Sequence, residues 1–142
     1  MKSKYYSAEQ AVKMLPLVKG YCRDLRDSFA EADGLVKQAR KLANMTALSD
    51  EAKDAILKQR EEVREKIDSV KARFKRWREE LDEMHLSSCC AELGRVDIPI
   101  FCDTLKSVIL LCVGPATDED NLEWHEVGED VENARPYMIG VL

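Results

Sequence analysis

Four polar residues in the last third of the chain are of the types that bind metal ions or transfer protons. They are Asp97, Glu123, His125 and Glu126. An imidazole beside carboxylates can bind a divalent cation or act in acid–base catalysis. On a strand, His125 and Glu123 would share one face, whereas Glu126 would face the other side. These four residues are the metal-ligand candidates, a divalent metal is the cofactor that they suggest, and no catalytic residue can be named.

A structural role for His125 competes with metal binding. One histidine with dispersed acids is weaker evidence for a metal than two histidines one helical turn apart. The imidazole could instead join the acidic strand region to the basic end of the helices, and this interpretation is favoured. Trp124 is predicted to pack in the core.

The five cysteines do not have the spacing of a disulfide framework or a zinc ribbon, since their number is odd and no Cys-x-x-Cys pair occurs. Reduced thiols are therefore expected. Vicinal Cys89 and Cys90 could form a redox or thiol-ligand site, but with no other motif nearby a reduced pair in a packed connection is favoured. The cysteines are Cys22, Cys89, Cys90, Cys102 and Cys112.

A basic cluster between Lys71 and Arg78 includes Phe74 and Trp77, a combination that can indicate nucleic-acid binding. Both aromatic residues, however, fall on the apolar stripe of a helix, so their rings would not be free to stack on bases. The chain also has a net charge of −5, which repels phosphate. A solvated or internally paired face is favoured over a nucleic-acid site.

The stretch from residue 7 to 86 must position everything else, and it reads as one long helical hairpin. Apolar or small residues recur in steps of four and three, which is the seven-residue repeat of helices wound as a coiled coil. The first series is Ala11, Leu15, Val18, Cys22, Leu25, Phe29, Ala32, Val36, Ala39 and Ala43, and the second is Ile56, Val63, Ile67, Val70, Phe74, Trp77, Leu81 and Met84.

Capping residues set the helix starts. Ser7 with Gln10 forms a capping box, Ser49 caps the second helix, and Pro16 predicts a kink without ending the first. If the hairpin folds about residues 46 and 47, Arg60 lies opposite Ala32. Its guanidinium could then form an ion pair with Glu31 or Asp33. The alanine-rich end near the loop should be thin and weakly held.

Three strand-like runs follow between residues 94 and 127, namely Val96–Cys102, Val108–Val113 and Leu122–Val127. Ser87 to Cys90 reads as a connection, and residues 128–142 as a C-terminal tail. The middle run is apolar at every position, so both of its faces should be covered. The helices would cover one face, and the tail Tyr137 to Leu142 or a partner subunit would cover the other.

These elements predict an α+β fold in one domain, residues 1–142. It consists of a long antiparallel two-helix coiled-coil hairpin with a small, mainly antiparallel three-stranded sheet at its open end. No run approaches the roughly 18 to 20 apolar residues of a membrane span, and Met1 to Tyr6 lacks the apolar core of a secretion signal. We expect a cytoplasmic protein without membrane contact.

Short blocks along the chain resemble those of DUF2203, an uncharacterised bacterial family. They are Tyr6-Ser7, Gln10-Ala11, Leu15-Pro16, Asp97-Ile98-Pro99, Leu111-Cys112 and Trp124-His125-Glu126. The chain departs from the family pattern at Ile98 in place of Phe, at Val113 in place of Trp, and at Asp130-Val131 in place of a Gly-Phe pair, while Arg135-Pro136 remains. It resembles a divergent member, and the resemblance implies no reaction.

Function is open at this level. The leading hypothesis is a non-enzymatic protein-interaction or scaffold module, and the alternative is a small metal-dependent or acid–base enzyme centred on His125 with Asp97, Glu123 and Glu126. A homodimer formed through the helices is expected, because Leu17, Tyr21, Leu35 and Leu42 widen the apolar stripe beyond a two-helix contact.

The distribution of charge predicts how the C-terminal part of the chain docks on the helical hairpin. Residues 1–86 carry 19 basic and 16 acidic side chains, whereas residues 87–142 carry 3 and 11. The acidic segment from Asp118 to Glu132 should therefore lie beside Arg73, Arg76 and Arg78 of the second helix.

Overall fold

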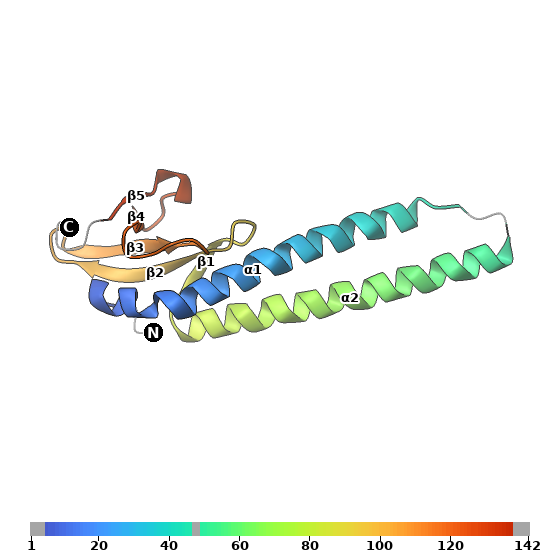
Figure 1. Ribbon diagram of the computed structural model, residues 1–142, viewed down its shortest axis with the longest axis horizontal. Coiled ribbons are helices and arrows are strands. Elements are labelled where there is room, and N and C mark those ends of the chain that lie inside the picture. The colour runs from blue at the N-terminus through green and yellow to red at the C-terminus, as the bar shows by residue number, and fades with distance from the viewer. Residues whose placement is uncertain (1–4, 47–48, 138–142) are drawn as a thin grey trace.

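A computed structural model describes residues 5–46 and 49–137 and confirms the α+β fold. Helices α1 (Ala8–Ala43) and α2 (Asp50–Glu83) form an antiparallel hairpin, and a sheet lies on α1 at the open end (Figure 1). No helix within the described ranges is long and apolar enough to cross a membrane. The strands are β1 (Ser87–Cys90), β2 (Arg95–Cys102), β3 (Ser107–Val113), β4 (Glu123–Glu126) and β5 (Arg135–Pro136), with a 3-10 turn, η1 (Val131–Asn133), before β5.

Both helices start as predicted. The Ser7 hydroxyl accepts from the Gln10 amide at 3.1 Å, and the Gln10 side chain accepts from the Ser7 amide at 2.9 Å. The Ser49 hydroxyl accepts from the Ala52 amide at 3.1 Å. These contacts satisfy amides that have no partner inside the first turn. α1 continues through Pro16.

The register of the hairpin differs from the predicted one. Arg60 reaches neither Glu31 nor Asp33, because its guanidinium donates to the Leu42 carbonyl at 2.8 and 3.2 Å. Glu31 instead binds Arg73 at 2.6 Å. α2 is thus displaced by about ten residues, or roughly three turns, from the predicted pairing. Figure 1 shows the same offset, since the start of α2 extends past the end of α1.

α1 changes the face that it buries part-way along. Up to Leu25 the predicted positions are buried and pack with the sheet. Beyond Leu25 every second predicted position is wrong by one residue, because Leu35 and Leu42 are buried while Phe29 and Val36 are exposed. Ala32 and Ala39 are partly buried, as predicted. Among the described residues, α1 packs only on α2 in this half. We call this contact the distal cluster, and its buried members are Leu35, Leu42, Val63 and Val70.

α2 buries the face that its periodicity predicted. Val63, Val70 and Leu81 are buried, and Phe74 and Trp77 pack against the core with their rings edge to face at 5.9 Å. The basic cluster between them therefore offers no free aromatic ring for stacking on bases.

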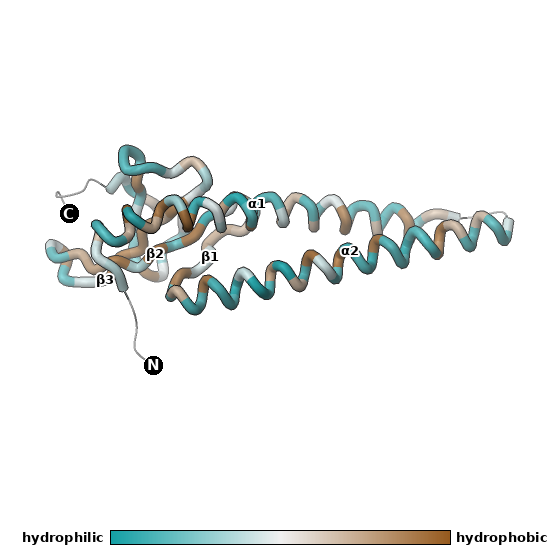
Figure 2. The backbone as a smooth tube through the Cα atoms, turned by 60° about the horizontal axis from the view of Figure 1, so that its bottom comes forward, coloured by the Kyte–Doolittle hydropathy of each residue, from teal (hydrophilic) through white to brown (hydrophobic). Residues whose placement is uncertain are grey.

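The sheet has five antiparallel strands in the order β1-β2-β3-β4-β5, where the sequence predicted three. The three predicted strands correspond to β2, β3 and β4 within one residue at each end. β1 was predicted as a connection, because a four-residue run of serine and cysteine lacks the β-branched and aromatic residues typical of strands. Figure 2 shows that hydrophobic residues concentrate in the strands and recur at intervals along the helices.

Tyr6 closes the edge of the sheet where β1 stops. Its amide donates to the Pro99 carbonyl at 2.8 Å, its carbonyl accepts from the Phe101 amide at 3.2 Å, and its hydroxyl donates to the Met84 carbonyl at 2.6 Å. Pro99 has no amide hydrogen to offer at this edge, which suits its position there. One residue thus connects the start of α1, the end of α2 and β2.

Two predictions about the C-terminal third have different outcomes. Tyr137 is buried in the core that the sheet shares with the helices, and its amide donates to the Leu122 carbonyl at 2.7 Å. Residues 138–142, the rest of the tail that was predicted to cover the second face of the middle strand, lie outside the described residues. The acidic segment lies at the open end, but the prediction that it lies beside α2 is wrong. Asp118 and Glu119 share a surface hollow with Lys19 and Arg23 of α1.

Candidate functional site

Titratable side chains gather on the face of the sheet opposite the hydrophobic core. Register places Asp97 of β2 beside Cys112 of β3, and Cys112 beside Glu123 of β4. Because alternate residues of a strand share a face, His125 belongs to the same face, whereas Ile98 and Leu111 belong to the other. We call this group the polar face, and its members are Cys89, Arg95, Asp97, Cys112, Glu123 and His125.

His125 and Asp97 form a buried pair. Imidazole Nε2 lies 3.0 Å from carboxylate Oδ1, and each side chain is at most 5% exposed. The other ring nitrogen, Nδ1, lies 3.1 Å from the carbonyl oxygen of Glu126. Both contacts are hydrogen bonds when both ring nitrogens carry protons, because a carbonyl and an ionised carboxylate only accept, and in that form the imidazole is a cation.

This protonation state decides what His125 can do. Burial lowers the pKa of its imidazole, but the hydrogen bond and the negative charge of Asp97 outweigh burial and raise the pKa above its ordinary 6.5. A ring with both nitrogens occupied offers no lone pair to a metal and cannot take a proton from a nucleophile. In this arrangement His125 holds Asp97 in place.

Cys89 and Cys112 are the second pair on the polar face, with their sulfur atoms 3.9 Å apart. The ladder between β1 and β2 shifts register between Ser88 and Cys90, so Cys89 is the extra residue of a bulge. Bulges commonly redirect a side chain at a functional site. Here the bulge residue is the one whose thiol meets Cys112.

The environment makes the two thiols unequal. The hydrogen bond from Cys89 lowers the pKa of Cys112, burial opposes this, and the Arg95 guanidinium 3.9 Å from the Cys112 sulfur lowers the pKa further. The same hydrogen bond and burial raise the pKa of Cys89. Negative charge on this pair therefore resides on Cys112.

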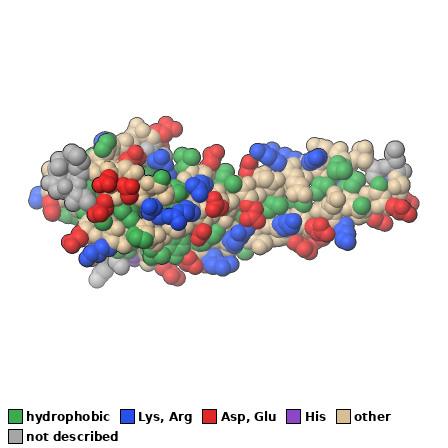
Figure 3. Space-filling model, viewed as in Figure 1, with side chains coloured by type: hydrophobic (Ala, Val, Ile, Leu, Met, Phe, Trp, Pro, Cys, Tyr) green, Lys and Arg blue, Asp and Glu red, His purple; other side chains and the backbone are tan. Residues whose placement is uncertain are grey.

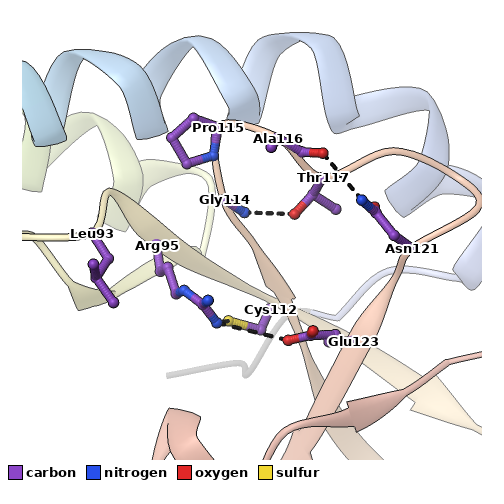
Figure 4. A pocket seen from close by; sticks show the side chains of 9 residues that line it. All are labelled: Leu93, Arg95, Cys112, Gly114, Pro115, Ala116, Thr117, Asn121 and Glu123. Carbon is purple, nitrogen blue, oxygen red and sulfur yellow. Dashed lines mark hydrogen bonds and ion pairs between the residues drawn. The ribbon is translucent and has the colours of Figure 1, made fainter.

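Cys112 lines a surface hollow of about 290 Å³ at the end of β3. In Figure 4 the Arg95 side chain extends toward Cys112 and Glu123, and Thr117 and Asn121 hold the loop that forms the opposite wall. The Arg95 guanidinium lies 3.7 Å from the Glu123 carboxylate. A small solute can thus approach Cys112 from this side, whereas Cys89 lines a separate hollow between β1 and α2.

The structure brings together only two of the four residues that the sequence predicted as metal ligands. Asp97 and His125 are in contact, Glu123 binds Arg95, and Glu126 is exposed on the opposite face of β4. Sequence reasoning missed Cys112 and Arg95, and it considered Cys89 only together with Cys90, favouring a packed, reduced pair over a thiol-ligand site. The pairing of Asp97 with Cys112 was available in principle, because a hairpin turn after Cys102 fixes which residues of β2 and β3 are opposite each other.

A second candidate site lies at the far end of the hairpin. Met45, Lys53, Ile56, Leu57 and Arg60 line a surface hollow of about 400 Å³ beside the loop. Apolar side chains lie on this part of the surface (Figure 3). We call the exposed apolar side chains of the hairpin beyond the sheet the tip surface; they are Phe29 and Val36 along α1 and Met45 and Leu57 beside this hollow.

Comparison with known families gives one result. The family described as "Uncharacterized conserved protein (DUF2203)" matches residues 4–136, which is nearly the whole chain. The comparisons with curated proteins and with solved structures found no match. Three blocks of the sequence that carry the resemblance supply Asp97, Cys112 and His125 to the polar face.

Proposed function

Because this chain belongs to the DUF2203 family of uncharacterized conserved proteins, we propose its function from geometry: it is a protein-interaction or scaffold module whose hairpin pairs with that of a second copy. One observation carries the proposal. The half of the hairpin beyond the sheet has no covering layer among the described residues, yet it presents apolar side chains on its surface (Figures 1 and 3).

The two helices do not use all their apolar residues on each other. Leu35 and Leu42, which the sequence suggested for contact between chains, are buried in the distal cluster. Phe29, Val36 and Leu57 remain 37%, 39% and 57% exposed. Phe29 and Val36 lie seven residues apart, so they form one stripe along α1. Exposed apolar stripes of this kind usually mark interfaces.

A second copy is the partner that the hairpin chemistry favours. Two hairpins can pack as a four-helix bundle, in which each contributes the same surface across a twofold axis. Acidic and basic residues both occur in the half of each helix beyond the sheet, so no single-sign field opposes the pairing. The contact would bury the apolar tip surface on both chains at once.

Light scattering of the purified chain tests this proposal. We expect a mass near twice the 16.2 kDa of one chain at micromolar concentration. The change Leu57→Glu should shift the mass to that of one chain and leave helix content by circular dichroism unchanged, because a charge in a bundle core opposes association.

Leu17→Glu is the matched control. Leu17 is also an exposed leucine, at 55%, but it lies on the part of α1 beside the sheet. This variant should keep the dimeric mass. A parent chain that stays at 16.2 kDa, or a Leu17→Glu variant that dissociates like Leu57→Glu, would contradict pairing through the tip surface.

A further inference from the structure

We propose that the polar face holds a zinc ion, coordinated by the Cys89 and Cys112 sulfur atoms and a carboxylate oxygen of Asp97. The ligand atoms of these three residues lie within 4.8 Å of one another, and they come from β1, β3 and β2. Thiolate ligands favour zinc over magnesium, calcium and manganese, which prefer oxygen ligands. Three protein ligands leave the fourth position of a tetrahedron for water.

The distance between the two sulfur atoms fits a metal better than a disulfide. Two sulfur atoms bound to one tetrahedral zinc at about 2.3 Å each lie about 3.8 Å apart, and the observed separation is 3.9 Å. β1 and β3 flank β2, so the two backbones are roughly 9 to 10 Å apart at the usual strand spacing. A disulfide needs Cα atoms within about 7 Å, so these thiols can meet but cannot close a bond without moving the strands.

Asp97 is already oriented as a ligand. Its Oδ1 accepts from His125 at 3.0 Å, which leaves Oδ2 for a metal. Carboxylates that bind metals are commonly held by such an outer hydrogen bond. Both ring nitrogens of His125 already have partners, the Asp97 carboxylate and the Glu126 carbonyl, so His125 is a positioning residue for this site. The bulge at Cys89 completes the set by bringing the first thiol across β2 toward the second.

Charge around the set matches a divalent cation. Two thiolates and one carboxylate carry three negative charges, and zinc compensates two of them. Two cationic side chains lie beside the remaining negative charge, namely the Arg95 guanidinium, 3.9 Å from the Cys112 sulfur, and a protonated His125, 3.0 Å from the Asp97 carboxylate. On binding, each thiol gives up its proton to the solvent and keeps the electron pair that bonds to the metal. The hollow beside Cys112 provides the entry path.

Cobalt substitution of the intact chain tests the site directly. The reduced chain is first treated with a chelator and then titrated with Co²⁺. We expect visible bands of tetrahedral cobalt and a near-ultraviolet thiolate charge-transfer band, both saturating at one equivalent per chain and both lost on addition of Zn²⁺.

The variant series uses neighbouring cysteines. Cys112→Ser and Cys89→Ser should remove most of the charge-transfer band and weaken zinc binding by at least the ~10-fold that loss of an outer partner alone causes. Cys90→Ser is the matched control, because Cys90 is half-buried next to Cys89 but outside the ligand set. It should bind zinc like the parent.

Alkylation of the parent chain gives a readout that needs no variant. Zn²⁺ should slow the modification of Cys89 by iodoacetamide and leave that of Cys90 unchanged, as mapped by mass spectrometry. A cobalt spectrum without a charge-transfer band, equal protection of Cys90, or an air-formed bond between Cys89 and Cys112 would each overturn the proposal.

Discussion

His125 and Asp97 show how a buried pair of charges is retained at a cost. Removing water from two charges is unfavourable, and their contact offsets this only while both partners are present. The His125 ring satisfies both of its nitrogens, so replacing either residue leaves a charge without a partner inside the sheet.

We predict that His125→Leu lowers the free energy of unfolding by about 3 to 5 kcal/mol. Asp97→Asn in the same background should recover part of this loss, because it removes the carboxylate that the first change leaves unpaired. Urea denaturation at neutral pH with chelator present measures both values. Strictly additive effects of the two changes would mean that the residues are not coupled.

Cys22 predicts a loss of stability in alkaline solution. Its thiol is buried and donates to the Val113 carbonyl at 3.3 Å, and burial raises its pKa from 9.0 to about 12. The unfolded chain therefore releases this proton at lower pH than the folded chain does. The free energy of unfolding should be insensitive to this group below pH 9.0 and should fall as the pH rises toward about 12.

The comparison of parent and Cys22→Ala isolates this effect. Urea denaturation under reducing conditions should show a shallower alkaline decline for the variant. The decline should not vanish, because burial also raises the pKa of Tyr21 and Tyr137. Parallel declines for parent and variant would rule Cys22 out as the cause.

Among the elements, the connection between β1 and β2 depends on one glycine. Gly94 has a φ of +66°, and a Cβ at this position would lie 2.2 Å from the Cys22 carbonyl oxygen and 2.9 Å from Arg26 Cβ. The chain thus approaches the α1 backbone as closely as only glycine permits.

We predict that Gly94→Ala destabilises the chain by about 2 to 4 kcal/mol, because it adds both a left-handed strain and a clash with backbone. Gly34→Ala is the control, since a Cβ there meets nothing within 4 Å. It lies inside α1 and should stabilise the chain by about 0.5 to 1 kcal/mol. Thermal unfolding of the two variants should shift in opposite directions.

The buried face of each helix could be predicted from periodicity only where the helix packs against the same element along its whole length. α2 packs with one stripe throughout its length, so its periodicity located the buried face correctly at Val63, Val70 and Leu81. α1 packs first on the sheet and then on α2 alone, and a single repeat carried past Leu25 therefore chose Phe29 where Ser28 is buried. The sequence of α1 alone does not indicate where its packing changes from the sheet to α2.

The contacts within the candidate site could not be predicted either, because they join residues of different strands. Asp97 and His125 were identified by residue type, but their contact crosses β3 and depends on two strand registers. Cys89 joins Cys112 only because a bulge shifts β1 by one residue. Bulges arise from the fit between two strands, and the sequence of one strand does not reveal them.

The whole molecule has a gradient of packing from the sheet to the tip. The main core joins both helices to the sheet, whereas the distal cluster rests on four buried residues. Regions with few buried apolar contacts open locally at a lower free energy than the rest. The sheet end should therefore set global stability.

Native-state hydrogen exchange measures this gradient. We predict that amides of residues 11–25 and 70–81 exchange with the free energy of global unfolding, while those of residues 36–43 and 50–57 exchange at a much lower one. Exchange should be measured at a protein concentration at which light scattering gives the mass of a monomer, because pairing of two chains would protect the tip. Uniform protection along α1 in the monomer would contradict the gradient.

Tyr6 is hydrogen-bonded to residues 84, 99 and 101, which leave the ribosome long after it does. The contacts at the open end of the hairpin therefore form late in synthesis. Synthesis releases α1 first, and its apolar face up to Leu25 must wait for strands that end at Val113. α2 emerges in between and can pair with α1 before any strand exists. The hairpin can therefore form during synthesis, but its sheet end closes only when most of the chain is complete, and nascent chains that stop earlier expose that face to aggregation.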